Sequence, residues 1–265
     1  MSLFIDEKVF LRLESWWQSV VDQAVEDAGS ATRRKKFLQL KVRHTKEVIG
    51  LCEEIARLKG WSDEQVMMAR IAGLLHDVGR FPQMARYGTF HDEKSVDHGL
   101  LGLRLIDEAG VLADIPALVR DALRFAVRWH NHLEYPSGNS EEEHSISLLK
   151  VVKDADRIDI MRVLKIEMID KMLDDEDELS VSVGLLEKVE RGEEVERTMI
   201  RTKVDHWLFV LNWVRQLYFS ESVVILSRKG YFQSLLELIP EDDDRVCSVK
   251  KRLLASFERR LEEAG

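Results

Sequence analysis

Histidine and aspartate side chains stand at positions from which a helix would direct them into the protein interior. His44 is followed by apolar residues at offsets of 4, 7, 11 and 14, so its imidazole belongs to the stripe that faces the core. Asp156 shares a stripe with apolar residues at offsets of −7, −4, +4 and +7. Burying an unpaired charge is costly, so this carboxylate needs a cation, a hydrogen-bond network or a metal ion.

Two more histidines follow the same pattern, and a fifth position carries a His-Asp pair. His98 and His130 are in helical register with apolar neighbours, and His76 and Asp77 are adjacent in the sequence LLHDVGR. Each histidine taken alone fits a hydrogen-bonded core residue. The combination favours a metal centre, because imidazole nitrogen and carboxylate oxygen are ligands for divalent ions such as Zn, Mn, Fe and Mg.

Helices are the elements expected to position these residues. Glycines that suit the left-handed C-cap end the predicted helices 4–29 and 31–59. Ser62 or Asp63 caps a third helix that reaches about residue 77, which puts the His-Asp pair at a helix end. The next stretch, 78–95, contains two glycines and a proline and predicts an irregular, partly exposed connection.

The rest of the chain also follows helical patterns. Further helices are expected at 95–109, at 116–131, and from about residue 143 through Asp156 to about residue 173. The acidic run at 174–178 interrupts the apolar pattern, so we predict one domain at 1–175, with its core at about 35–165, and a helical extension at 176–265. The fold class is all-α, in agreement with only 4 prolines and 14 glycines.

Composition limits the partners and the compartment. The formal net charge of −9 disfavours nonspecific binding to nucleic acid. The first ten residues lack the features of a signal peptide, and no apolar run is long enough to span a membrane. Cys52 and Cys247 stand alone, without the spacing of a disulfide framework or a thiolate zinc site. We expect a cytoplasmic protein.

The ordered motif resembles a known family. His44, then His76 and Asp77 in LLHDVGR, then Asp156 in KDADRID resemble the H…HD…D signature of the HD superfamily of metal-dependent phosphohydrolases. The resemblance covers roughly residues 35–165 and implies an all-helical domain that hydrolyses phosphate esters, commonly of nucleotides. It also implies that Asp156, the aspartate before the basic residue, is the ligand in KDADRID. Asp154 remains a candidate for supporting the ligands, against a surface or capping role.

A longer form of the domain, which holds two metal ions, is similar to two further stretches. These are GTFHDEKSVDHGLLG, with His98, and RWHNH, with His130 and His132. The resemblance implies that His98 and His130 bind a second ion and that Asp77 bridges the two ions, with His132 as the alternative to His130. The sequence therefore predicts one or two divalent ions per chain, among Mn, Fe, Co, Ni, Zn and Mg. His91, in a polar stretch, is expected at the surface.

The expected chemistry is attack of a metal-activated water on phosphorus. Asp77 and Arg80 are the candidate catalytic residues, and Arg80, Arg86, Arg128 and His132 are candidates for binding the substrate. A basic cluster around His44 fits either a solvated helix face or a surface that attracts a phosphorylated substrate; its members are Arg33, Arg34, Lys35, Lys36, Lys41, Arg43 and Lys46.

Two expected features of the HD subfamilies are missing. The acidic pair that follows the HD dipeptide in alarmone hydrolases and the Gly-Tyr-Pro signature of the cyclic-dinucleotide branch are both absent from the sequence. Alarmones and cyclic dinucleotides are therefore not favoured as substrates, and the leading hypothesis that the resemblance implies is an enzyme acting on a small, nucleotide-like phosphomonoester or phosphodiester. The alternative is a catalytically weak HD-fold module that binds a ligand or regulates a partner. The aromatic run at 206–219 fits internal packing or a homodimer face.

Overall fold

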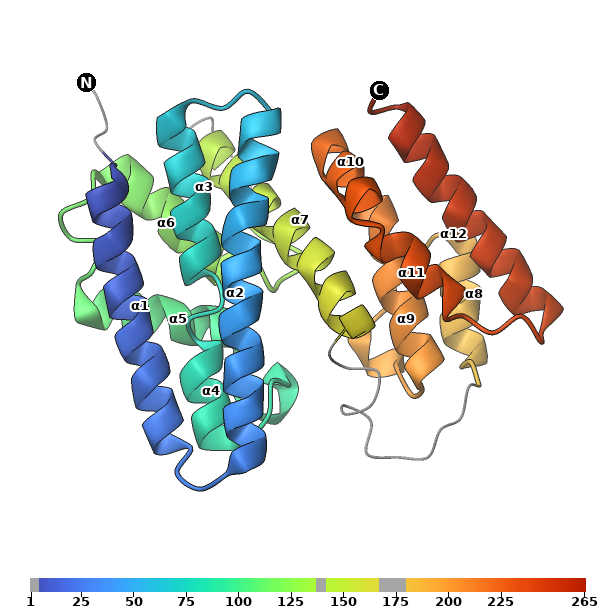
Figure 1. Ribbon diagram of the computed structural model, residues 1–265, viewed down its shortest axis with the longest axis horizontal. Coiled ribbons are helices and arrows are strands. Elements are labelled where there is room, and N and C mark those ends of the chain that lie inside the picture. Colours follow the sequence, from blue (N-terminus) through green and yellow to red (C-terminus); the bar gives the residue numbers. More distant parts are fainter. Residues whose placement is uncertain (1–4, 137–141, 167–179) are drawn as a thin grey trace. The chain divides into compact units, whose positions relative to one another are not determined.

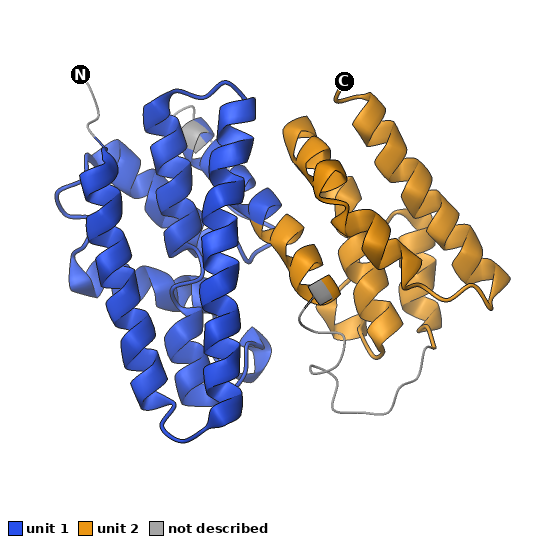
Figure 2. Cartoon of the chain, in the orientation of Figure 1, with its two compact units in different colours: residues 1–155 blue, residues 156–265 orange. Residues whose placement is uncertain are grey.

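A computed structural model describes residues 5–136, 142–166 and 180–265 of the protein. The described residues form helices and connecting segments and contain no strand, which confirms the all-α prediction. They divide into two compact units, residues 1–155 and 156–265, as Figure 2 shows. No helix among the described residues combines the length and the hydropathy needed to cross a membrane.

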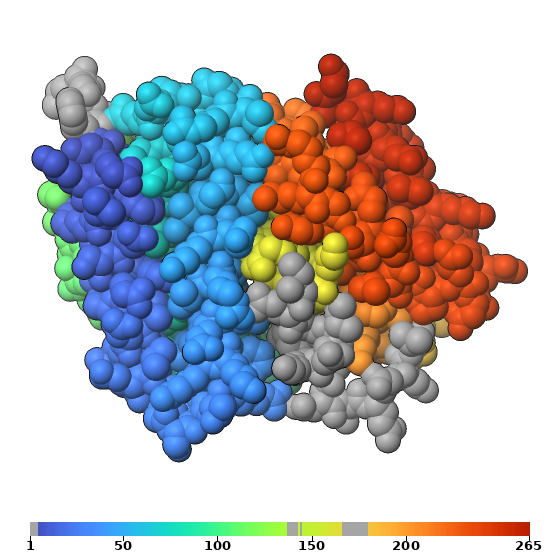
Figure 3. All heavy atoms as spheres, in the orientation of Figure 1, coloured from blue at the N-terminus to red at the C-terminus, as the bar shows by residue number. Residues whose placement is uncertain are grey.

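The first unit holds the segments that carry the predicted site (Figure 1). Its elements are α1 (Glu7–Asp27), α2 (Thr32–Leu58), α3 (Asp63–Leu75), α4 (Arg80–Tyr87), the 3-10 turn η1 (Asp92–Lys94), α5 (His98–Ala109), α6 (Ala117–Trp129) and the first part of α7 (Glu142–Ile166). Helix α2 packs mainly against α3, α1 packs against α3 and α4, and α5 packs against α6. The surfaces of α1 and α2 lie side by side on one face of this unit (Figure 3).

The predicted helix boundaries in this unit agree with the structure within a few residues. Gly29 and Gly60 adopt φ of +54° and +71°, just beyond the ends of α1 and α2, as the left-handed C-cap requires. Ser62 caps α3 in a capping box with Gln65. Pro116 is the N-cap of α6.

The prediction of an irregular, partly exposed connection at 78–95 is wrong for its first half. Residues Arg80–Tyr87 form α4, and Phe81 and Met84 are buried. Pro82 lies in the first turn of α4, where its missing N–H costs no helical hydrogen bond. Gly88, with φ of +68°, ends α4. Pro82 and Gly88, which suggested a loop, thus mark the first turn and the C-terminal end of a short helix.

The second unit begins within α7, which continues across the boundary between the units. Its other elements are α8 (Val183–Arg191), η2 (Arg197–Met199), α9 (Lys203–Asn212), η3 (Trp213–Gln216), α10 (Ser220–Lys229), α11 (Tyr231–Glu237) and α12 (Asp244–Glu262). Further helices were predicted here and are confirmed. The predicted domain boundary after residue 175 and the predicted end of the long helix near residue 173 lie outside the described residues.

Candidate metal centre

Four buried histidines reach one place in the first unit from different elements. His44 lies within α2, and His76 follows the last residue of α3. His98 is the first residue of α5, and His130 follows the last residue of α6. Their exposed fractions lie between 0% and 6%. Helix ends and the N-terminal half of α2 therefore supply the imidazoles, while the apolar stripes of the same helices anchor them in the core.

Asp77 lies in the middle of these histidines and is only 3% exposed. Its Oδ2 is 3.5 Å from Nε2 of His44 and 3.5 Å from Nε2 of His76. Its Oδ1 is 3.3 Å from Nε2 of His98 and 3.4 Å from Nε2 of His130. One carboxylate thus faces two pairs of imidazoles, each pair through a different oxygen.

The donor atoms form two groups that share Asp77. In the first group, donor atoms of His44, His76, Asp77 and Asp156 all lie within 4.8 Å of one another; in the second, those of Asp77, His98 and His130 do. Asp156 is half-buried rather than buried, and its place is set by α7, one residue beyond the first unit. All six residues predicted as metal ligands are therefore brought together, in the two sets that the sequence suggested.

Hydrogen bonds on the far side of three rings set which nitrogen faces Asp77. Nδ1 of His76 is 2.7 Å from the Gly73 carbonyl oxygen, and Nδ1 of His130 is 2.9 Å from the Val127 carbonyl oxygen. Nδ1 of His98 is 2.6 Å from a carboxylate oxygen of Asp92. Because carbonyl and carboxylate oxygens only accept hydrogen bonds, the Nδ1 atoms carry the protons. In the neutral rings Nε2 then carries the lone pair that a metal ion binds.

The contact between His98 and His130 fits a cation. Their Nε2 atoms are 3.0 Å apart, and with both protons on Nδ1 two lone pairs would face each other. Burial, reinforced by the neighbouring histidines, lowers the pKa of His130 to about 4 against the contact with the Asp77 carboxylate, which raises it. A neutral imidazole is the form that ligates metal, and nitrogen and oxygen donors of this kind suit a divalent ion.

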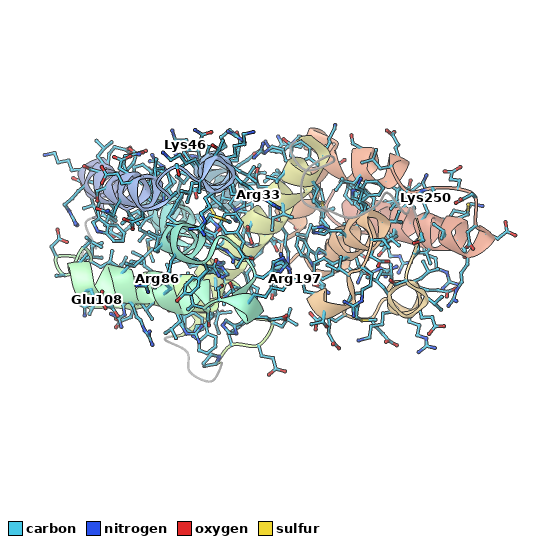
Figure 4. The ribbon with its side chains drawn as sticks, turned by 90° about the horizontal axis from the view of Figure 1, so that it is seen from below. Arg33, Lys46, Arg86, Glu108, Arg197 and Lys250 are labelled. Carbon is cyan, nitrogen blue, oxygen red and sulfur yellow. The ribbon has the colours of Figure 1, made fainter. Side chains whose placement is uncertain are left out.

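Asp77 is ionised although it is buried. Burial acts to raise its pKa, but the charge of Lys41 and the close histidine rings of His76, His130 and His44 together hold the pKa well below its ordinary value. The Lys41 ammonium lies 2.5 Å from Oδ2 of Asp77. Lys41 belongs to the predicted basic cluster, and the structure brings it to the centre itself. Lys46 of the same cluster lies exposed on the outer side of α2 (Figure 4).

A hydrogen-bond network that the sequence analysis missed supports His98. Its hub is Asp92, which accepts from Arg80 Nη1 at 2.9 Å and from Gln83 Nε2 at 2.8 Å besides contacting His98. Burial acts to raise the pKa of Asp92, but His98 and Arg80 hold it far below its ordinary value. The signal was a carboxylate six residues before a histidine, and only the fold of the connecting segment shows that the two side chains meet.

The residues predicted to bind substrate lie in different places. Arg80 is buried, with Nη1 donating to Gln83, Phe90 and Asp92 and Nε 3.5 Å from Asp77. That arrangement makes it a support for the centre, in addition to any part in binding phosphate. Arg86 lies exposed near the end of α4 (Figure 4).

Arg128 and His132 form a separate polar cluster with Asp97. The guanidinium of Arg128 and Nε2 of His132 are each 3.0 Å from Oδ2 of Asp97. The alternative ligand His132 therefore faces Asp97, whereas His130 faces Asp77. His91 is exposed, as expected.

The acids of KDADRID have separate environments. Asp156 joins the first histidine group, whereas Asp159 is bound by the Arg162 guanidinium one helical turn away, with Nε at 2.6 Å. Asp154 is fully buried on the same helix. The resemblance thus selected, among three acids in six residues, the one whose oxygen lies with the histidines.

A glycine allows the His-Asp turn to approach α5. A Cβ atom on Gly79 would lie 2.1 Å from the His98 carbonyl oxygen and 2.7 Å from the Gly102 backbone nitrogen. Backbone φ at Gly79 is −66°, so glycine is needed here for space and not for an unusual backbone conformation. This close contact keeps Asp77 within reach of His98.

One comparison with known proteins agrees with the geometry. Residues 42–161 match the family model described as HD domain, a range that begins just before His44 and ends just after Asp156. The comparison with curated proteins and the comparison with solved structures each gave no match.

Proposed function

Because residues 42–161 of the chain form an HD domain, we propose that the protein is a metal-dependent phosphohydrolase that cleaves a phosphomonoester or phosphodiester bond of a small substrate. The observation that carries the proposal is Asp77, whose two oxygens face two separate histidine pairs. Such a carboxylate suits the bridge of a two-ion site, the arrangement used to stabilise the attacking and leaving oxygens of a displacement at phosphorus.

The side chains prepare the centre for two cations. The Nε2 atoms of His44, His76, His98 and His130 surround an ionised Asp77, and Asp156 adds a second carboxylate to the first group. Divalent ions bound there would lower the pKa of water so that hydroxide is available near neutral pH. The hydrogen bond from His98 to Asp92 holds this ring in its ligand orientation, as partners behind metal ligands commonly do.

The charge beside the centre supports a phosphorylated substrate. Lys41 is 15% exposed at its side chain and lies 2.5 Å from Asp77, so its ammonium stands where nonbridging oxygens of a phosphoryl group at the centre would come. A cation in a water-poor site stabilises the charge that develops on these oxygens during the displacement. Lys41 is therefore our first choice for the residue that contacts the phosphoryl group.

Elemental analysis of the purified chain combined with an activity panel tests the proposal. We expect close to two transition-metal ions per chain after saturation with Mn or Co, and metal-dependent hydrolysis of chromogenic phosphomonoesters or phosphodiesters. His44→Gln and His98→Gln should each lower the metal content by about one ion, because each removes a ligand of a different group. His91→Gln, at an exposed histidine of the same segment as Asp92, is the matched control and should change neither value.

Two outcomes would contradict the proposal in different ways. Stoichiometric metal without turnover of any phosphate ester would leave a ligand-binding or regulatory HD module. No metal under any condition, with equal behaviour of the His98→Gln and His91→Gln variants, would show that the buried histidines serve the core alone.

A further inference from the structure

One face of α2 continues from the candidate centre toward the N-terminus of the helix with residues that suit a substrate. Lys41, Phe37 and Arg33 precede His44 by three, seven and eleven residues, spacings that keep them on one side of a helix. At 1.5 Å per residue, Phe37 lies about 10 Å along the helix from His44. A cation and then an aromatic ring thus follow the metal ligand in order.

A second aromatic ring meets Phe37 from another segment. Phe90, between α4 and η1, packs edge-to-face against Phe37, with ring centroids 5.9 Å apart and an angle of 81° between the planes. The Phe90 backbone is fixed because its carbonyl oxygen accepts a 2.5 Å hydrogen bond from Arg80. Both rings are half-buried, whereas Phe81, in the edge-to-face pair with Trp17, has no exposed surface.

Cations border both rings and connect them with the candidate centre. The Lys41 ammonium lies 5.7 Å from the centroid of Phe90 while it contacts Asp77 at 2.5 Å. The guanidinium of Arg80 lies 5.7 Å from the same centroid, and that of Arg33 lies 5.8 Å from the centroid of Phe37. Figure 4 labels Arg33 near the start of α2. Core packing alone would bury this aromatic pair. Instead the two rings keep exposed surface, and Lys41 lies between them and Asp77.

We propose that Phe37 and Phe90 form the specificity site for an aromatic group of the substrate, such as a nucleobase or an aryl ring, while Lys41 contacts its phosphoryl group. This inference rests on the proposed phosphohydrolase function and names the substrate class for it. Its physical basis is stacking, since every nucleobase and aryl ring has a π-face that an aromatic side chain binds. A phosphate ester without an aromatic group lacks this contact and keeps only the phosphoryl interactions.

The test compares esters that differ in the aromatic group alone. Binding of adenosine 5′-monophosphate, phenyl phosphate and ribose 5-phosphate to the metal-loaded full chain is measured by equilibrium dialysis, and KM and kcat are measured for each. We expect the aromatic esters to bind more tightly than ribose 5-phosphate. Phe37→Leu and Phe90→Leu should weaken their binding by about 5- to 150-fold, the range that corresponds to loss of one stacking contact, with kcat nearly unchanged.

Control variants separate specificity from folding. Trp16→Leu replaces a half-buried aromatic residue on α1, a helix that contributes no residue to the histidine groups, and should leave the preference unchanged. Phe37→Tyr keeps an aromatic face and should restore tight binding of the aromatic esters. Both substitutions also report whether a loss in Phe37→Leu comes from general destabilisation.

The outcomes distinguish this inference from the proposed function. Equal binding of aromatic and aliphatic esters would overturn the aromatic site, and so would equal weakening of both in Phe37→Leu and Phe90→Leu. Hydrolysis of either ester would still support the proposed phosphohydrolase function. Tight, phenylalanine-dependent binding of aromatic esters without hydrolysis supports the aromatic site and overturns the catalytic proposal.

Discussion

Two aspartates, one in each compact unit, are almost completely removed from water, and their surroundings differ. Asp205 in the second unit has 0% exposure, and Asp77 in the first has 3%. The carboxylate of Asp205 accepts hydrogen bonds from Ser182 N and Oγ at 2.8 and 2.6 Å and from the backbone N–H groups of Arg201 and Thr202 at 2.9 and 3.2 Å. These donors hold the start of α9 to the segment before α8.

The neighbours of Asp77 come from distant parts of the chain and present a different chemistry. Apart from Lys41 and Arg80, the atoms around it are Nε2 atoms of histidines, which carry lone pairs wherever Nδ1 is bound to an acceptor. A buried carboxylate is thus no sign of a functional site by itself. N–H and O–H donors around it indicate a structural role, and converging lone pairs indicate a site for a cation.

The largest effect is expected from Asp77→Ala, because this residue belongs to both groups of donor atoms. Metal binding and phosphate ester hydrolysis should fall below detection, since no other carboxylate in the described part of the chain belongs to both groups. Helical content measured by circular dichroism should stay close to that of the wild type, because the apolar framework is unchanged. Retention of two metal ions per chain in this variant would contradict the assignment of Asp77.

Asp205→Ala should have the reverse effect and so sharpens the comparison. The change leaves the donors around Asp205 without their acceptor, and we expect a loss of about 3 kcal/mol in the free energy of unfolding of the second unit. Chemical denaturation measures this loss, and elemental analysis should find the metal content unaltered. A metal loss in folded Asp205→Ala protein would show that the division between a structural and a functional carboxylate is wrong.

Asp92→Asn tests the support behind one histidine. The substitution removes the charge that faces Nδ1 of His98 at 2.6 Å, and loss of such a partner typically lowers metal affinity about 10- to 100-fold. The affinity for an ion at the His98 and His130 group should fall within this range in a metal titration, while binding at the His44 and His76 group should be retained.

Asp97→Asn is the matched control for Asp92→Asn. Asp97 is also close to His98, but it caps α5 through Leu100 N at 3.1 Å and pairs with Arg128 and His132. Asparagine is an equally good N-cap, so metal affinity should be unchanged. Equal losses in both variants would mean that the net negative charge, and not the hydrogen bond to His98, controls the second ion.

The sequence predicted the ligands better than it predicted their supports. Ligand positions follow from helical periodicity and from an ordered motif, both of which are local in the chain, so His44 and His130 could be assigned before the structure. Asp92 and Phe90 lie in an irregular segment where no period applies, and their contacts depend on how that segment folds back. Lys41 was placed in a basic cluster that fits either a solvated helix face or a surface that attracts a phosphorylated substrate, because nothing local in the chain shows that Asp77 comes within 2.5 Å of it.

Prediction of the fold succeeded where the apolar spacing of a helix is repeated over several turns. It failed where a helix is too short for such a repeat. Long helices such as α2 repeat their apolar spacing over several turns, and glycine caps mark their ends. Helix α4 has only 8 residues, too few for a repeated pattern, and its proline occupies a position that helices tolerate. Proline interrupts a helix in its interior but not in its first turn, and only the structure shows that α4 begins two residues before Pro82.

An exposed carboxylate completes the series and should have the smallest effect. The side chain of Glu7 is 54% exposed and lies 2.7 Å from Arg70. The hydrogen bond from Arg70 lowers the pKa of Glu7 in the folded protein, against a smaller opposing effect of burial. Solvent screens a pair of this kind, so Glu7→Gln should cost only about 0.2 to 1 kcal/mol near neutral pH, with the metal content unchanged.

The cost of Glu7→Gln should change with pH in a direction that follows from the lowered pKa of Glu7. Because the folded pKa of Glu7 lies below the unfolded one, its contribution to stability is present above the unfolded pKa and disappears as the pH falls through the folded pKa. The difference in unfolding free energy between the wild type and Glu7→Gln, measured in urea, should therefore shrink toward zero in acid. A cost at neutral pH as large as that of Asp205→Ala would show that exposure does not separate these carboxylates.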